Sequence, residues 1–202
     1  MAIAILDYGS GNLHSVARAI AEVGGEPFVT GEPGEVAGAD AMVIPGVGHF
    51  GACMRAIAHH GLDAVIRDFH TTGRPLFGVC VGMQVLFERS DEDAEPGLAL
   101  LPGAVRALPS DVKVPHMGWN TVEWSGSHPY VEGIPVDQRY YFVHSYAPGI
   151  DPDITIGVTE HGRPFGAVVA RDQVFATQFH PEKSGDAGLE LYERFVKDVA
   201  SR

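Results

Sequence analysis

Apolar residues in the first half of the chain follow two alternating spacings, which predict strands and helices in turn. Short apolar runs, typical of strands buried in a parallel sheet, occupy 2–6, 26–29, 41–44 and 75–80. Apolar residues that recur every three or four positions, as on one face of a helix, cover 13–23, 50–57, 62–69 and the stretch from 83 onward. Asn12 stands where the first helix would begin, and we expect it to cap that helix. This order predicts a parallel sheet with helices on both faces.

The second half of the chain is dominated by strand signals. Runs rich in β-branched and aromatic residues cover 140–143, 154–158, 165–170 and 174–179. The short polar link at 171–173 predicts a hairpin between the last two. A final helix is expected over 189–199, where the apolar residues share one face. We therefore predict an α/β fold in which antiparallel strands extend a central, mostly parallel sheet. No repeat or long linker divides the chain, so a single domain over 1–202 is expected.

Composition and charge narrow the possible functions. The chain has 202 residues, 45% hydrophobic and 20% charged, with a formal net charge of −12. A negative balance of this size argues against nucleic-acid or membrane-surface binding, both of which need a basic face. The first residues turn polar after a short apolar run, so we expect neither a signal peptide nor a membrane span there. Two cysteines without paired spacing, Cys53 and Cys80, indicate reduced thiols in the cytoplasm.

Cys80 is the strongest candidate for a nucleophile. It is the central residue of Gly78-Val79-Cys80-Val81-Gly82, at the expected junction of a strand and a helix, which is the form of a nucleophile elbow. Such a turn presents the sulfur at the carboxyl end of the sheet, and a helix N-terminus beneath it favours the thiolate. The Val81 N–H would then point to where an oxyanion forms. The alternative is a buried core cysteine, which is the better interpretation of Cys53.

A thiol nucleophile needs a base, and His180 has a suitable setting. Pro181 favours an extended backbone at His180, and residues two apart in extended chain project to the same side. Glu182 could then accept a hydrogen bond from one ring nitrogen and leave the other to face Cys80. A surface His-Pro-Glu turn is the alternative. Together with the cysteine elbow, the segment favours a catalytic site.

A glycine-rich segment at 46–51 matches a pattern found in dinucleotide-binding sites. The next strand, however, ends at a cysteine rather than at an acidic residue that could bind a ribose. A turn that offers the Val47 or Gly48 N–H to an oxyanion fits the segment better. The sequence contains no CxxC or HExxH pattern, so neither a metal nor a cofactor is expected.

Longer stretches around these residues resemble the class I glutamine amidotransferases over essentially the whole chain. The cysteine elbow and the His180-Pro181-Glu182 segment carry the likeness to the class. Other segments are similar to the glutaminase subunits of imidazole glycerol phosphate synthases, which act in histidine biosynthesis: 8–12, 45–48, 115–120, 141–146 and 180–184. The resemblance implies a flavodoxin-like amidotransferase fold. Val81 departs from the leucine usual in the family, with little consequence expected because the position acts through its N–H.

The resemblance also implies a role for each candidate residue. Cys80 would attack the side-chain amide of glutamine, His180 would transfer protons, and Glu182 would orient the imidazole. The oxyanion would be stabilised by backbone N–H groups of Val81 and of the Val47–Gly48 turn. The remaining residues match positions that hold glutamine, the last two by receiving its α-carboxylate: Gln84, Glu92, Ser145 and Tyr146.

A separate partner chain is implied as well. In this family it is a (β/α)8-barrel cyclase, which uses the ammonia to make imidazole glycerol phosphate and an aminoimidazole ribotide. The residues expected on the shared face are Asn12, Trp119, Asn120 and Lys183; the alternative for Trp119 is a core position. We expect the isolated chain to hydrolyse glutamine slowly, because glycines on both sides of Val47 would let its peptide rotate out of a productive orientation.

Three other interpretations stay open at this point. The chain could be the glutaminase of another synthase, such as one that makes anthranilate, guanylate or pyridoxal phosphate. It could be a cytosolic cysteine peptidase or a related thiol hydrolase. It could also be a non-catalytic regulatory subunit that retains the fold.

Overall fold

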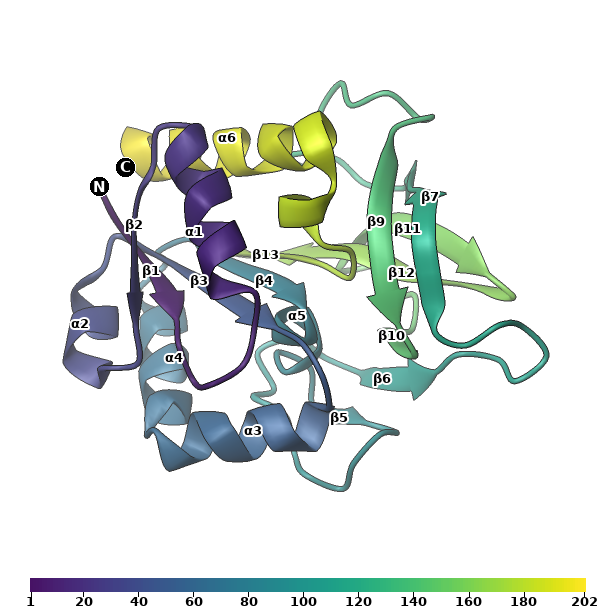
Figure 1. The fold of residues 1–202 in the computed structure, drawn as a ribbon, viewed down its shortest axis with the longest axis horizontal. Helices are drawn as coiled ribbons and strands as arrows, with labels where there is room; N and C mark the ends of the chain where they lie inside the picture. The colour runs from purple at the N-terminus through teal and green to yellow at the C-terminus, as the bar shows by residue number, and fades with distance from the viewer.

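The computed structural model describes residues 1–202, and its centre is one large mixed sheet (Figure 1). The eight strands lie in the order β2-β1-β3-β4-β13-β12-β11-β8. Their bounds are β1 (Ala2–Leu6), β2 (Glu26–Thr30), β3 (Ala41–Gly46), β4 (Leu76–Cys80), β8 (Glu123–Trp124), β11 (Thr155–His161), β12 (Arg163–Arg171) and β13 (Val174–Thr177). The first five in spatial order are parallel, and the last three are antiparallel to their neighbours. The predicted α/β fold with an antiparallel extension is therefore confirmed.

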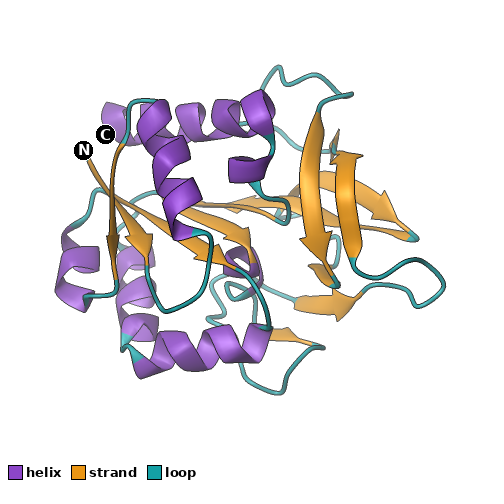
Figure 2. Cartoon of the chain, viewed as in Figure 1, coloured by secondary structure: helices purple, strands orange, loops and turns teal.

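Helices cover both faces of the parallel part of the sheet (Figure 2). One layer consists of α1 (Leu13–Glu22) and α6 (Gly185–Ser201). The other consists of α2 (Pro33–Gly38), α3 (Phe50–His59) and α4 (Leu62–Thr71). Phe77 of β4 shows how the layers meet, because its ring lies 5.4 Å from those of both Tyr192 and Phe195 on α6. No helix is both long and apolar enough to span a membrane.

Two smaller sheets pack beside the antiparallel end of the large one (Figure 1). A two-stranded ribbon pairs β7 (His116–Thr121) with β9 (Arg139–His144). A three-stranded sheet joins β10 (Tyr146–Pro148), β6 (Ala104–Ala107) and β5 (Arg89–Ser90). The turn from β9 into β10 brings residues 143–146 to the carboxyl end of β4, where ligands bind in α/β sheets.

Several local predictions need correction. Asn12 occupies the N-cap position of α1, but its side chain makes no capping hydrogen bond. The helix expected from residue 83 onward is the four-residue α5 (Val81–Gln84), and Leu86 and Phe87 follow it. Strands β5 to β8, strand β10 and helix α2 were not predicted, because most span only two to six residues and lack a clear apolar period. The predicted hairpin is present: Arg171 pairs with Val174, and Asp172 adopts φ 52° in the turn between them.

Candidate active site

Cys80 sits at a strained strand-to-helix turn, as the elbow motif predicts. It ends β4, precedes α5 and adopts φ 55° and ψ −111°. A non-glycine residue held at such angles costs about 1–3 kcal/mol, so the surrounding packing must maintain it. Gly82 allows this close packing, because a Cβ at its position would overlap the Ile44 carbonyl of β3. The elbow therefore depends on glycine where the new helix crosses the neighbouring strand.

The Cys80 sulfur is shielded from bulk solvent but opens onto a cavity. The residue is 3% exposed and lines a cavity of about 390 Å³. The Gln178 side-chain nitrogen approaches the sulfur to 3.7 Å, and the Val143 carbonyl oxygen lies 4.0 Å from it. A cavity of this volume is in the range of small-ligand sites. The sulfur can thus react with a bound small molecule while bulk water is excluded.

His180 and Glu182 form a buried pair at the same cavity. The ring Nδ1 donates to a carboxylate oxygen of Glu182 at 2.8 Å, and both side chains are 1% exposed. This leaves Nε2 without a hydrogen-bond partner in the protein, and His180 lines the cavity together with Cys80. Burial lowers the pKa of the imidazole, but the adjacent Cys80 sulfur and the Glu182 carboxylate outweigh it and raise this pKa to about 10. These contacts favour the protonated imidazolium form of His180.

The reason that His180 meets Glu182 differs from the prediction. His180 is extended, with φ −101° and ψ 97°, but Pro181–Lys183 form a 3-10 turn, so Glu182 does not lie on extended chain. The turn instead folds the carboxylate back onto the ring. It is held by the Ser184 hydroxyl, which donates to the His180 carbonyl at 2.7 Å, and by the His180 N–H, which donates to Tyr141 of β9.

The four residues expected to hold a substrate all line this cavity: Gln84, Glu92, Ser145 and Tyr146. The buried Gln84 amide nitrogen donates to the Tyr146 carbonyl at 2.9 Å and to Gln178 Oε1 at 3.0 Å. Gln178 was not predicted. It could have been found from its position two residues before His180, since alternate residues of an extended segment share a side.

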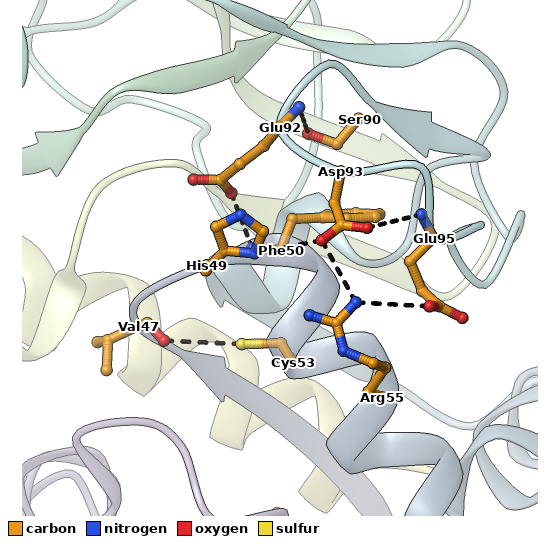
Figure 3. Close-up of polar contacts among 9 residues, drawn as sticks. All are labelled: Val47, His49, Phe50, Cys53, Arg55, Ser90, Glu92, Asp93 and Glu95. Atoms are coloured by element: carbon orange, nitrogen blue, oxygen red, sulfur yellow. Dashed lines mark hydrogen bonds and ion pairs between the residues drawn. The ribbon is translucent and has the colours of Figure 1, made fainter.

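Glu92 belongs to a loop that anchors the start of α3 (Figure 3). Its carboxylate accepts a hydrogen bond from the Phe50 N–H at 2.7 Å. The next residue, Asp93, forms an ion pair with Arg55 at 3.3 Å, and its carboxylate lies 3.7 Å from Nδ1 of His49. A Cβ on Gly51 would collide with the Asp93 carboxylate, so a larger residue there would require this side chain to move from its present position. The residues that follow the Val47–Gly48 turn are therefore held firmly.

Ser10 binds the Val47–Gly48 turn on the side that faces away from the cavity. The Ser10 hydroxyl donates to the Val47 carbonyl at 2.7 Å, and the Val47 N–H points back at the same hydroxyl oxygen at 3.5 Å. Val47 and Gly48 line the cavity, whereas Ser10 does not. Gly48 adopts φ +93°, which other residues rarely adopt, and its N–H makes no hydrogen bond within the protein. The Val47 N–H is thus directed at the Ser10 hydroxyl, and the Gly48 N–H remains free.

The residues expected at a partner surface divide into two groups. Trp119 is 52% exposed, and Lys183 is exposed near it, with its amine 6.0 Å from the Tyr141 ring centre. Met117, two residues along β7 and not predicted, is 61% exposed. Asn120 differs, because its side-chain nitrogen contacts His116 at 3.3 Å and the Glu160 carbonyl at 3.0 Å. Successive residues of a strand face opposite sides, so Asn120 turns inward when Trp119 turns outward.

The chain belongs to the class I glutamine amidotransferases. The family model described as glutamine amidotransferase class-I matches residues 4–199, so the family inferred from the motifs is confirmed. A solved structure titled as a glutamine amidotransferase has the same fold, with a TM-score of 0.74 over 99% of both chains at 20% identity. A putative GMP synthase subunit from Thermoplasma acidophilum gives the same TM-score at 19% identity, covering 100% of this chain and 94% of that one.

More similar in sequence are proteins named imidazole glycerol phosphate synthase subunit HisH. The protein from Neisseria meningitidis is 44% identical, over 97% of this chain and 99% of its own. The protein from Symbiobacterium thermophilum is 45% identical, over 98% and 96%. The protein from Thermobifida fusca is 46% identical, over 96% and 97%. Each is named as a subunit, and each matches this chain along nearly its whole length.

Proposed function

We propose that this chain is the glutaminase subunit of an imidazole glycerol phosphate synthase. It hydrolyses L-glutamine to L-glutamate and ammonia and passes the ammonia to a cyclase subunit in histidine biosynthesis. The family and the near full-length similarity to HisH proteins support this assignment. The structural observation that carries it is the strained Cys80, which faces one cavity with the His180–Glu182 pair.

The first half of the reaction forms a thioester. His180 takes the proton of the Cys80 thiol, and the sulfur attacks the side-chain carbonyl carbon of glutamine as the carbonyl electrons move onto oxygen. As the tetrahedral intermediate collapses, His180 gives a proton to the amide nitrogen, and ammonia leaves. Glu182 keeps the imidazole oriented, because it occupies Nδ1 and leaves Nε2 facing the cavity. General acid–base transfer of this kind contributes about 10²–10⁴-fold to the rate.

The second half regenerates the thiol and makes glutamate. His180, now neutral, removes a proton from water, and the resulting hydroxide attacks the thioester carbon. The carbon–sulfur bond then breaks, the sulfur leaves as thiolate and takes back the proton held by His180, and glutamic acid loses its proton to solvent to become glutamate. The sum is glutamine plus water giving glutamate and ammonia. Because Cys80 is 3% exposed, the water must enter through the cavity after ammonia has left.

Both tetrahedral intermediates carry an oxyanion next to α5. We assign the Val81 N–H, at the start of that helix, as one donor, and an N–H of the Val47–Gly48 turn as the second. Each donor contributes about 3–4 kcal/mol to transition-state stabilisation. In the structure the Val47 N–H points at Ser10 instead of the cavity. An isolated chain with one donor turned away is expected to be slow, and a change in this turn is a means by which the partner could activate it.

Glutamine would lie along the cavity with its amide at Cys80. The Glu92 carboxylate supplies a negative charge for the α-amino group, and backbone N–H groups of Ser145 and Tyr146 receive the α-carboxylate. Gln84 and Gln178 hold this segment near the sulfur through their contacts with Tyr146 and Cys80. The cavity lining thus presents polar groups to the α-carbon end of glutamine and the Cys80 sulfur to its amide end. This difference sets the direction in which glutamine binds.

The partner is a cyclase subunit with a (β/α)8 barrel, forming a heterodimer. Ammonia reacts as a nucleophile only when neutral, so a passage that excludes water preserves it between sites. We place the shared face at the exposed edge of β7 and the turn after His180, with Trp119, Lys183 and Asn12 on it and Asn120 behind it. We further propose that the protein is cytoplasmic and forms a single amidotransferase domain over 1–202; the proposed reaction uses no metal or cofactor.

The decisive experiment measures glutamate formed from glutamine by the purified chain, alone and with a cyclase subunit and its nucleotide substrate. We expect slow turnover alone and a large increase with the partner. Cys80→Ala should abolish glutamate formation and still bind the cyclase, whereas Cys53→Ala should retain the activity. Full activity of the isolated chain, or glutamate production by Cys80→Ala, would contradict the proposal.

Two measurements separate the alternative functions. A barrel cyclase that co-purifies with the chain distinguishes this assignment from a glutaminase of another synthase. A glutamine analogue with an electrophile at the side-chain position should modify Cys80 and leave Cys53 unmodified, because burial raises the pKa of the Cys53 thiol. Preferential reaction with peptide electrophiles would instead indicate a cysteine peptidase.

A further inference from the structure

Two buried histidines outside the proposed triad are joined by a hydrogen bond. Nδ1 of His116 on β7 lies 3.0 Å from Nε2 of His144 on β9, and the two residues are 5% and 6% exposed. They do not belong to any group of three side chains arranged to hold a metal ion. His144 lines the cavity, and His116 lies behind it, so the pair leads away from the proposed glutamine site.

The donor and the acceptor of each hydrogen bond can be assigned in turn, starting from the Tyr146 carbonyl at one end of the series. His144 Nδ1 lies 2.9 Å from the Tyr146 carbonyl oxygen, which can only accept, so Nδ1 carries a hydrogen. Burial, together with the neighbouring His116, lowers the pKa of His144 to about 3, so the ring is neutral and its Nε2 accepts. His116 must therefore donate from Nδ1. Burial, with His161 beside it, lowers the pKa of His116 to about 4, which leaves its Nε2 as an acceptor.

Asn120 supplies the donor at the other end. Its side-chain oxygen accepts a hydrogen bond from the Thr121 N–H at 2.9 Å, which fixes the orientation of the amide. The nitrogen then faces His116 Nε2 at 3.3 Å and the Glu160 carbonyl at 3.0 Å, one hydrogen for each. A directed chain thus runs from Asn120 through His116 and His144 to the Tyr146 carbonyl.

The Tyr146 backbone faces the cavity because of its place in the β10–β6 ladder. The Leu108 N–H donates to the Ser145 carbonyl, and the Gly149 N–H donates to the Ala104 carbonyl. Hydrogen-bonded pairs alternate in an antiparallel ladder, so Tyr146 opposite Ala107 is a non-bonded position. Its N–H and its carbonyl both point away from β6, toward the side where His144 and Gln84 bind the carbonyl. That carbonyl and that N–H belong to the two peptide planes that meet at the Tyr146 Cα, so in the extended strand fixing the carbonyl plane also restricts the plane that carries the N–H.

We propose that Asn120, His116 and His144 are positioning residues that set the orientation of the Tyr146 backbone, and that they connect this part of the glutamine pocket to the strand that carries Trp119. The proposal rests on the function proposed above. His116 cannot turn freely, because its ring is stacked between those of Phe142 and His161 at 4.8 and 4.3 Å. A shift of β7 therefore moves the whole chain of donors.

The first test changes the residue that contacts Tyr146. His144→Phe removes the donor to the carbonyl and should raise the KM for glutamine about two- to tenfold, the range for losing one hydrogen bond, with a smaller effect on kcat. His144→Asn keeps a donor near the Nδ1 position and should restore a KM close to that of the unchanged protein. His59→Phe, the same change on the exposed end of α3, is the matched control.

The second test asks whether the effect passes through His116. His116→Phe should raise the KM in the unchanged protein, because His144 loses the donor that fixes its tautomer. In the His144→Asn background the same substitution should have no further effect, because the shorter side chain does not reach residue 116. Equal effects in both backgrounds would show that His116 acts only through general packing and would overturn the proposed chain.

A direct measurement reads the tautomers of the two histidines in the unchanged protein. Ring ¹⁵N shifts of the unchanged protein should show both histidines as neutral Nδ1–H tautomers near pH 7, and Asn120→Ala should shift the ring signals of His144, which residue 120 does not touch. An Nε2–H tautomer at His144, or signals that do not respond to Asn120→Ala, would overturn the proposal. A protein with these tautomers and no glutaminase activity, alone or with a cyclase, would refute the proposed function instead.

Discussion

The Ser10 hydroxyl contacts both backbone groups of Val47: it donates to the Val47 carbonyl at 2.7 Å and lies 3.5 Å from the Val47 nitrogen. The Cys53 sulfur approaches the same carbonyl to 3.6 Å from α3 (Figure 3). These contacts come from the side of the turn that faces away from the cavity. They hold the Val47 N–H out of the position where an oxyanion would form, so Ser10 acts as a restraint on the turn.

Removing that restraint should change the unstimulated rate. We expect Ser10→Ala to raise kcat for glutamine hydrolysis by the isolated chain about two- to tenfold, the effect of one lost hydrogen bond, and to reduce the stimulation by the cyclase. Initial rates of glutamate formation with and without the partner provide the measurement. Ser127→Ala, in an exposed loop, is the control. A lower rate in Ser10→Ala would mean that Gly48, rather than Val47, supplies the second donor in the present orientation.

The His180 ring gives a prediction about pH. Burial lowers its pKa, but contact with the Cys80 sulfur and with Glu182 raises it to about 10, above the ordinary value of 6.5. Because folding raises this pKa, the interaction stabilises the protein fully below pH 6.5 and is lost as the pH rises through about 10. In an NMR titration the ring should stay protonated to well above pH 8. Cys80→Ala should lower the midpoint, and Cys53→Ala should leave it in place; a midpoint near 6.5 in the unchanged protein would contradict the ion pair.

The elbow glycine gives a prediction about stability. Gly82→Ala would push a Cβ into the Ile44 carbonyl of β3, where backbone cannot yield without moving the strand. We expect a loss of more than about 2 kcal/mol in unfolding free energy and no glutaminase activity. Gly34→Ala is the matched control, since a Cβ there meets nothing within 4 Å, and a stabilisation of about 0.5–1 kcal/mol is expected in a helix. Denaturant unfolding with both variants measures the difference.

Local sequence patterns were sufficient to predict the parts of the site that depend on neighbouring residues. The elbow around Cys80 is visible because glycines flank the cysteine at a strand end, and His180 is visible because a proline and a glutamate follow it. The contact between His180 and Glu182 was correctly predicted, but for the wrong reason. A proline after an extended residue permits a 3-10 turn as well as a strand, and only the packing of Ser184 selects the turn.

Features that depend on distant segments could not be predicted in this way. Ser10 meets Val47 because β1 and β3 end side by side, and the register of those strands is a property of the whole sheet. The β7–β9 ribbon is similar: β9 overlaps the strand predicted over 140–143, but its partner β7 carries polar and apolar residues without a period strong enough to be recognised. The family resemblance placed Asn120 on the partner face without indicating the direction of its side chain, which the strand turns toward His116.

Replacing Trp119 would test where the partner binds. It is 52% exposed on β7, its ring centre lies 6.0 Å from that of Tyr141, and Met117 beside it is 61% exposed. An aromatic side chain this exposed loses contact with water only if another chain covers it, and such residues often dominate binding energy. Trp119→Ala should weaken cyclase binding at least tenfold, which corresponds to a loss of about 1.4 kcal/mol or more in binding free energy. Val136, in the loop before β9, is 76% exposed, and Val136→Ala should bind the cyclase normally. Equal affinities for the two variants would place the interface on another face.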